Sequence, residues 1–277
     1  MTINVHPLLH ESIVVNGAKR TLLQQDREQI DTIVLGSSHG DFGFDPAFFP
    51  GSFNLCCRSQ DLKHSYLLYK HIAETYPAVR NVVLYYSVFS PGSVMEKSPS
   101  EKFISPALNE LFNLRLDYDD PELQSEFEKI RGQLGAVTVD SKGYRGFFAN
   151  DFRIFLPESY GALNRANDHL RYNRAEEANL YLIRTLLLAK HLGHKTCIVV
   201  PPVRSDFKQV TGMGFEALFK SLLDILYHIH LDYPVELING FDSPLFSDDH
   251  FGDYDHLLPL GKGTEILSDL VRRAFTP

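Results

Sequence analysis

Five short apolar runs divide the chain. They are rich in β-branched residues and nearly continuous, without the alternation of apolar and polar positions that marks a strand with one solvated face. Strands buried on both faces have this pattern, so each run is predicted to be a strand of a parallel sheet. The runs are residues 32–36 (TIVLG), 52–57 (SFNLCC), 81–87 (NVVLYYS), 196–201 (TCIVVP) and 235–240 (VELING).

Amphipathic segments with helical spacing lie between most of these runs. In residues 59–76 apolar side chains recur every three or four positions, with Ser59 as a candidate N-cap and Pro77 as a stop signal. Three further segments share the pattern: residues 173–192, with Gly193 as the expected C-terminal signal, 215–230 and 261–275. Strands that alternate with helices predict right-handed crossovers and a parallel sheet covered on both faces.

A polar stretch, residues 90–167, interrupts this alternation. It contains SPGSVMEKSPSEK and DYDDPELQSEFEK and has only short helical patterns. We therefore predict a single domain over residues 1–277 with an inserted subdomain at about 91–167, after the third strand. An insertion at the carboxyl ends of the strands would cover a site; a decorative subdomain or a dimer contact is the alternative. Arg145, in the loop SKGYRGFFAND, is a candidate substrate contact.

Charge and composition exclude some classes of partner. The chain has 277 residues, of which 44% are hydrophobic, and a formal net charge of -8 with acidic and basic residues intermingled. Because no basic stripe could complement a phosphate backbone, no nucleic-acid partner is expected. No run approaches the roughly 18 to 20 apolar residues of a membrane span, and the start of the chain lacks the apolar core of a signal peptide. We expect a cytoplasmic protein without a membrane span, and a homo-oligomer is compatible with the sequence.

The cysteines indicate a reducing environment. Cys56, Cys57 and Cys197 are odd in number and lie in or beside apolar runs. This pattern is typical of reduced, buried thiols and not of a disulfide framework. A CxxC metal site is excluded because that spacing does not occur.

The stretch LGSSHGD, residues 35–41, directly follows the first predicted strand. Its Gly36-x-Ser38-x-Gly40 pattern matches the nucleophile elbow of α/β-hydrolases, in which a tight turn exposes a serine. That fold is disfavoured because its elbow follows several strands and an oxyanion loop, whereas Ser38 follows the first strand. A phosphate-cradling turn is disfavoured because the Gly-x-x-x-x-Gly-Lys pattern is absent. His39 is interpreted as a neighbour that shapes the turn.

A base for Ser38 is found near the other end of the chain, in DDHFGDYDHLLPLGKG. Asp253 and His256 are spaced as D-x-x-H just before a predicted helix, whose first turn would contain Pro259. A carboxylate three residues ahead of a histidine can turn back toward the imidazole, which fixes the tautomer whose other nitrogen accepts the Ser38 proton.

The same acidic stretch could instead bind a divalent metal, because carboxylates and imidazoles at this density are candidate ligands. Acidic loops are more often simply solvated, and no metal is expected. The residues concerned are Asp248, Asp249, His250, Asp253, Asp255 and His256.

These features resemble the SGNH (GDSL-type) hydrolase superfamily: an early strand followed by Gly-x-Ser, and a late D-x-x-H-L followed by Gly and a C-terminal helix. The resemblance covers nearly the whole chain apart from the insertion. It implies an α/β fold, a three-layer α/β/α sandwich with a five-stranded parallel, flavodoxin-like sheet, in agreement with the strand count. By position, Ser38 would be the nucleophile, His256 the base and Asp253 the acid that orients it.

The family builds its oxyanion hole from the N–H of the nucleophile, a Gly and an Asn. Here NLCCRSQDL has Cys57 or Arg58 near the Gly position, and YYSVFSPG has Ser87 or Ser90 but no Asn. A backbone N–H does not require Gly, whereas a lost donor costs about 10²- to 10³-fold in rate. The drifted middle blocks resemble the divergent carbohydrate-associated branch, which contains sugar O-acyl esterases and O-acetyltransferases.

The resemblance implies a serine-dependent acyl-ester hydrolase or O-acyltransferase that acts on an acylated carbohydrate or similar alcohol through an acyl-enzyme. No cofactor is implied, and acetyl-CoA is a candidate acyl donor, although no CoA-binding motif is found. Arg204, in PPVRSDF after the fourth strand, is a candidate for holding an anionic substrate group. The alternatives are a non-catalytic binding or assembly protein of the same fold and a metal-dependent hydrolase at the acidic stretch.

Overall fold

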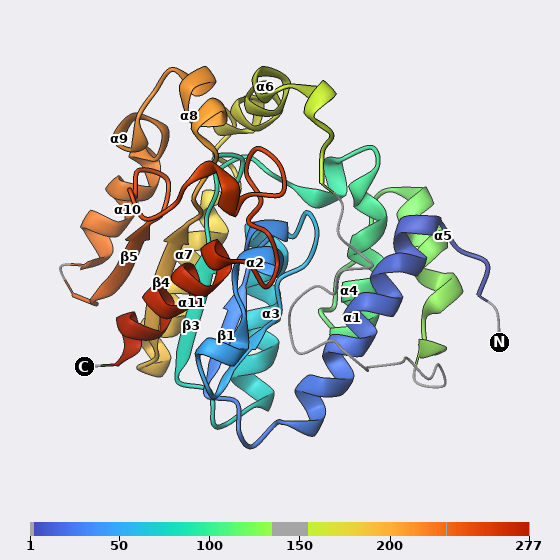
Figure 1. The fold of residues 1–277 in the computed structure, drawn as a ribbon. Coiled ribbons are helices and arrows are strands. Elements are labelled where there is room, and N and C mark those ends of the chain that lie inside the picture. Colours follow the sequence, from blue (N-terminus) through green and yellow to red (C-terminus); the bar gives the residue numbers. More distant parts are fainter. Residues whose placement is uncertain (1–2, 135–154, 231, 277) are drawn as a thin grey trace.

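A five-stranded, all-parallel sheet forms the centre of the computed structural model, which describes residues 3–134, 155–230 and 232–276 (Figure 1). The strand order is β2-β1-β3-β4-β5. The strands are β1 (Thr32–Leu35), β2 (Ser52–Asn54), β3 (Asn81–Tyr85), β4 (Lys195–Val200) and β5 (Val235–Asn239). Each of the five apolar runs therefore contains a strand, and the predicted α/β class with a five-stranded parallel sheet is confirmed.

Helices cover both faces of the sheet, which makes the three layers of the sandwich (Figure 1). Val34 and Val83 lie in one buried cluster with Leu267 of α11. Their strand neighbours Ile33 and Leu84 belong to the opposite cluster, which α3, α7 and α10 cover. The α-helices of the described chain are α1 (Pro7–Gln25), α2 (Ser38–Gly43), α3 (Leu62–Thr75), α4 (Ser105–Phe112), α5 (Pro121–Ile130), α6 (Ala162–Asn173), α7 (Asn179–Leu192), α8 (Ser205–Thr211), α9 (Phe215–Leu218), α10 (Lys220–His230) and α11 (Lys262–Phe275).

Several helix boundaries differ from the prediction. α3 begins after Asp61, whose carboxylate accepts the N–H of His64 at 2.8 Å, whereas Ser59 adopts a φ of 56° outside the helix. Asp61 is therefore the cap, and the prediction of Ser59 is wrong. Pro259 precedes α11, whose N-cap is Gly261.

Two predicted helices are each divided. Residues 173–192 contain the last residue of α6 and the whole of α7, which ends at Gly193 in the left-handed conformation as predicted. Residues 215–230 form α9 and α10, separated at the buried Phe219.

The N-terminal helix α1 was not predicted from the sequence. Its buried positions include the polar residues Ser12, Asn16 and Lys19 beside apolar ones such as Leu9 and Ile13. An apolar stripe is the signal by which amphipathic helices are recognised, and α1 lacks one because it buries polar groups as well. None of the helices in the described part of the chain combines the length and hydropathy needed to cross a bilayer.

The insertion lies between β3 and β4 and packs in two places. α4 packs on α1, and α5 packs on α4 (Figure 1). α6 packs on α8 near the carboxyl ends of the strands and runs to Asn173, past the predicted boundary at residue 167.

The strand order also predicts where a ligand would bind. β1 lies between β2 and β3, so the chain leaves β1 toward one edge of the sheet and returns on its other side. In open parallel sheets, ligands occupy the crevice outside the carboxyl ends of the strands at this reversal. Ser37 and Ser38 directly follow β1 at this point.

Candidate active site

The turn after β1 is shaped by close packing. Gly36 has a φ of 142°, and a Cβ there would lie 2.6 Å from the Cβ of Tyr85. At Gly40 a Cβ would lie 2.5 Å from Sγ of Cys56. Both positions therefore require glycine, and half-buried Ser38 between them begins α2.

Ser38 and His256 meet although they are 218 residues apart. Oγ of Ser38 lies 2.8 Å from Nε2 of His256, and Nδ1 of His256 lies 2.9 Å from Oδ1 of Asp253. Because an ionised carboxylate only accepts hydrogen bonds, Nδ1 carries the proton and Nε2 accepts the serine hydroxyl. The structure thus brings together the three residues predicted as nucleophile, base and orienting acid.

The D-x-x-H segment curls back on itself. Phe251 and Leu257 form an antiparallel bridge, and the N–H of Gly252 donates to the carbonyl of His256 at 2.8 Å. This curl places Oδ1 of Asp253 3.0 Å from the backbone N–H of His256.

Asp253 is held as a carboxylate. Burial acts to raise its pKa, but the charge and hydrogen bond of His256, together with the N–H of Leu156 at 3.0 Å, outweigh it and keep the pKa of Asp253 below its usual range. An acid that stays ionised can stabilise an imidazolium as it forms.

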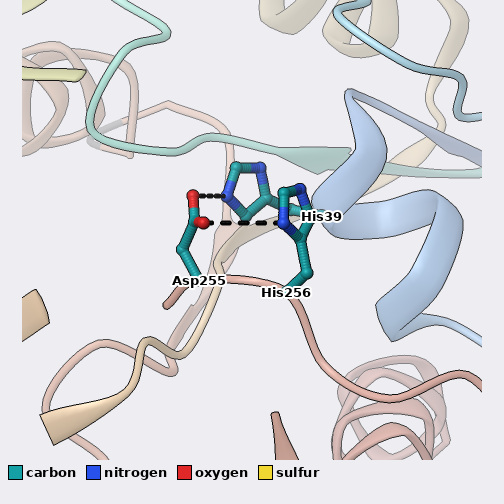
Figure 2. A group of neighbouring side chains, drawn as sticks. All are labelled: His39, Asp255 and His256. Atoms are coloured by element: carbon teal, nitrogen blue, oxygen red, sulfur yellow. Dashed lines mark hydrogen bonds and ion pairs between the residues drawn. The ribbon is translucent and has the colours of Figure 1, made fainter. Parts of the chain in front are cut away.

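A second polar cluster lies against the first (Figure 2). Asp255 accepts Nε and Nη2 of Arg165, both at 2.9 Å, and Nε2 of His39 at 2.8 Å. Nε2 of His169 lies 3.3 Å from the same carboxylate. The ring of His39 stacks on that of His256 with centroids 4.8 Å apart, and its Nδ1 lies 2.9 Å from the Ser37 hydroxyl.

Burial sets the charge states in this cluster. It lowers the pKa of His39 despite the nearby carboxylate, and burial with the charge of Arg165 places the pKa of His169 well below its usual value. Burial would raise the pKa of Asp255, but Arg165 and the surrounding imidazoles hold it well below its usual range. Two neutral imidazoles therefore surround an ionised carboxylate that is paired with a guanidinium.

His39, Asp255 and His256 offer ligand atoms that lie within 4.8 Å of one another, so they form a candidate metal site (Figure 2). A divalent cation would have to displace Arg165 from the carboxylate or bind beside its charge. The donor set therefore fits an ion pair and not a metal. Two acids of the stretch considered as an alternative metal site have other partners: Asp248 accepts the N–H of Ser205, and Asp249 accepts the hydroxyl of Ser247.

A cavity of about 310 Å³ opens over Ser38 and His256. Residues 93–101 and helix α6, both from the segment between β3 and β4, form much of its wall. It is lined mainly by hydroxyl, charged and aromatic side chains, among them Ser59, Ser93, Ser98, Ser100, Arg58, Arg165, Asp168, Phe89 and Tyr172.

One of the backbone N–H groups predicted as an oxyanion donor already has an acceptor. The N–H of Cys57 donates to the carbonyl of Gly36 at 3.1 Å and is occupied. The N–H groups of Ser38, Arg58 and Ser59 have no acceptor among the residues that the structure describes, and all three residues line the cavity. The φ of 56° at Ser59 is in the left-handed region that glycine favours, so the chain turns sharply directly after Arg58.

Two other candidates lie away from the cavity. Ser87 is buried, and its N–H donates to the Ser90 hydroxyl at 2.8 Å. Arg204 pairs with Glu158 and Asp206, and its guanidinium lies 4.5 Å from the ring centroid of Tyr254. Arg204, the N-cap of α8, thus contacts Asp206 in its own helix as well as Glu158 and Tyr254, and its guanidinium is engaged in ion pairs. Arg145 lies outside the described residues.

Several residues at the site were not predicted. Arg165 and His169 are four residues apart on one face of α6, and Lys19 of α1 forms a buried ion pair with Asp41, 2.5 Å apart. Lys19 also donates to the carbonyl of Cys56 and so joins α1 to the loop after β2. Two features of the sequence could have indicated this cluster: the acid Asp255 directly before His256, and the Arg-x-x-x-His spacing of Arg165 and His169 in a region predicted as loop.

The pKa shifts of the three cysteines do not favour a thiolate. Cys56, Cys57 and Cys197 are buried and free, as expected for reduced cysteines. Burial raises the pKa of all three, so they remain protonated.

No protein-family model matches the chain, and no curated protein matches it.

Proposed function

We propose that this protein is an SGNH-like, serine-dependent acyl-ester hydrolase or O-acyltransferase that acts on an acylated carbohydrate or a similar alcohol. The observation that carries the proposal is the continuous hydrogen-bonded chain from Ser38 through His256 to Asp253 at the base of the cavity. The location at the strand-order reversal, where open parallel sheets bind ligands, supports the same conclusion.

In the proposed reaction, Oγ of Ser38 attacks the carbonyl carbon of the acyl ester and its proton passes to Nε2 of His256. Asp253 stabilises the imidazolium. The oxyanion accepts the free N–H groups of Ser38 and of the Arg58–Ser59 turn, which supply backbone donors in place of the missing Asn.

Collapse of the tetrahedral intermediate breaks the bond to the alcohol oxygen, which takes the proton from His256 and leaves an acyl-enzyme on Ser38. Water or a second hydroxyl then attacks with His256 as base and restores the serine. Water gives a hydrolase, and a sugar hydroxyl gives a transferase.

The cavity lining supports an alcohol with many hydroxyl groups. Its serines and charged side chains can donate and accept hydrogen bonds, and Tyr172 and Phe89 offer ring faces. The proposal includes a cytoplasmic location, where acetyl-CoA is available as acyl donor.

The test is covalent labelling with a serine-reactive fluorophosphonate, followed by intact-mass measurement and peptide mapping. We expect one adduct, located on Ser38, that is absent from Ser38→Ala. Ser37→Ala is the matched control, because the Ser37 hydroxyl contacts His39 and not His256; it should still be labelled at residue 38.

A folded wild-type protein that forms no adduct would contradict the proposal and favour a non-catalytic binding or assembly protein of the same fold. Labelling is repeated with EDTA, because a chelator-sensitive acyl-esterase activity without an adduct would instead support the metal-dependent alternative. Incubation with acetyl-CoA and glycan acceptors then separates transferase from hydrolase.

A further inference from the structure

His256 lies between two carboxylates. Asp253 accepts its Nδ1–H at 2.9 Å, and Oδ1 of Asp255 lies 3.5 Å from the same nitrogen. When the imidazole takes the Ser38 proton, both carboxylates stabilise the new positive charge. The proposed mechanism uses only the first of them.

Arg165 determines how strongly the second carboxylate acts. Its Nε and Nη2 form a two-point contact with Asp255, which fixes the carboxylate in place and offsets part of its charge. Arg165 is also a lining residue of the cavity, on helix α6. The position of the Asp255 carboxylate beside His256 therefore depends on how α6 packs against the site.

Because the neighbouring imidazoles are neutral, the Arg165–Asp255 ion pair is the charged group beside His256 that a substitution can alter. Asp255 is contacted by His39 from α2 and by His169 from α6, and burial keeps both imidazoles neutral. The other charged or titratable groups near His256 and Arg165 are Asp253 in the D-x-x-H segment, Asp41 from α2 with its partner Lys19 from α1, and Asp168 from α6.

We propose that Arg165 and Asp255 form a positioning pair for His256, in which Asp255 supplies a second carboxylate at the imidazole and Arg165 holds it in place and limits its field. The inference rests on the proposed function, since it assigns these residues a role in the same site.

The test measures the rate of fluorophosphonate labelling of Ser38 as a function of pH. The labelling rate rises as the base loses its proton, and the midpoint of this rise reports the apparent pKa of the coupled groups at the site. In Arg165→Met the uncompensated carboxylate favours the protonated base, so the midpoint should move up by about one pH unit. In Asp255→Asn the guanidinium of Arg165 remains and disfavours the protonated form of the base, so the midpoint should move down by a similar amount.

The double variant Arg165→Met/Asp255→Asn leaves no unpaired ion buried, so it should fold even if a single variant does not. Its midpoint should return toward that of the wild type, while its maximal rate falls about tenfold because the second carboxylate is lost. Arg174→Met is the matched control, since Arg174 is exposed at the end of the same helix; its profile should match the wild type.

Unmoved midpoints in the folded single variants, or a wild-type maximal rate in the double variant, would overturn the pairing. A merely structural role would lower the labelled fraction without moving the midpoint. Failure of the proposed function is distinguishable, because the wild type itself would then form no adduct.

Discussion

Asp253 and Asp255 are two residues apart and have different partners. Asp253 accepts the Nδ1–H of His256 and the backbone N–H groups of Leu156 and Asp255. Asp255 faces Arg165 and His39 instead. The role of each acid in this segment therefore follows from its hydrogen-bond partners, because both carboxylates lie near Nδ1 of His256.

Replacing Asp253 by Asn should greatly reduce the reactivity of Ser38. An amide can donate to Nδ1, so the imidazole proton moves to Nε2 and no lone pair faces the serine. We expect the fluorophosphonate labelling rate at pH 8 to fall by about 10³- to 10⁴-fold. Circular dichroism verifies folding, and labelling at the wild-type rate would exclude Asp253 as the orienting acid.

The three main site residues could be predicted from the sequence because each stands in a local pattern. Gly-x-Ser-x-Gly reflects the contacts of Gly36 with Tyr85 and of Gly40 with Cys56, and D-x-x-H reflects the curl at Asp253. Lys19 carries no such pattern and Arg165 only the weak Arg-x-x-x-His spacing, because both meet their partners through tertiary packing.

At the scale of elements, α1 is joined to the site by one buried ion pair. Nζ of Lys19 contacts Asp41 and the carbonyl of Cys56, and both side chains of the pair are almost fully buried. Burial raises the pKa of Asp41 although Lys19 opposes the shift. The carboxylate of Asp41 therefore depends on α1 for the cation with which it forms its buried ion pair.

Lys19→Met should lower the free energy of unfolding by about 3 to 5 kcal/mol, because it leaves a buried carboxylate unpaired. Lys19→Met/Asp41→Asn should recover much of this loss, because neither charge remains. Urea denaturation measures both. Additive losses in the double variant would show that the two residues are not coupled, and Lys220→Met in an exposed pair should stay close to wild type.

The strands were predicted more accurately than the helices. The apolar runs are short and distinctive, although β5 is only partly buried. Each run extends past the end of its strand at the carboxyl edge, most of all at β2 and β3. The boundaries of α3 and α6 depend on Asp61 as a cap and on packing against α8, and neither contact can be read from apolar spacing.

At the scale of the molecule, buried neutral histidines make stability depend on pH. The pKa of His169 is lowered by burial in the folded protein, so below pH 6.5 the unfolded chain binds a proton that the folded chain does not. The free energy of unfolding should therefore fall as the pH is lowered, with His39 contributing in the same direction.

For His169 the expected loss between pH 6.5 and 5.5 is about 1 kcal/mol. Urea denaturation at the two pH values should show a smaller difference for His169→Gln than for the wild type. His228→Gln replaces an exposed histidine and should leave the difference unchanged. Equal pH dependence in His169→Gln and the wild type would contradict the assignment.

The separation of 218 residues between Ser38 and His256 has a consequence for biosynthesis. A chain emerges from the ribosome from its N-terminus, and folding generally follows that order. Under the proposed function, the hydroxyl of Ser38 would remain inert during synthesis until the segment that contains His256 has been released and has folded. A product that ends early would carry the serine without its activating partner, so incomplete chains could not act on acyl esters in the cell.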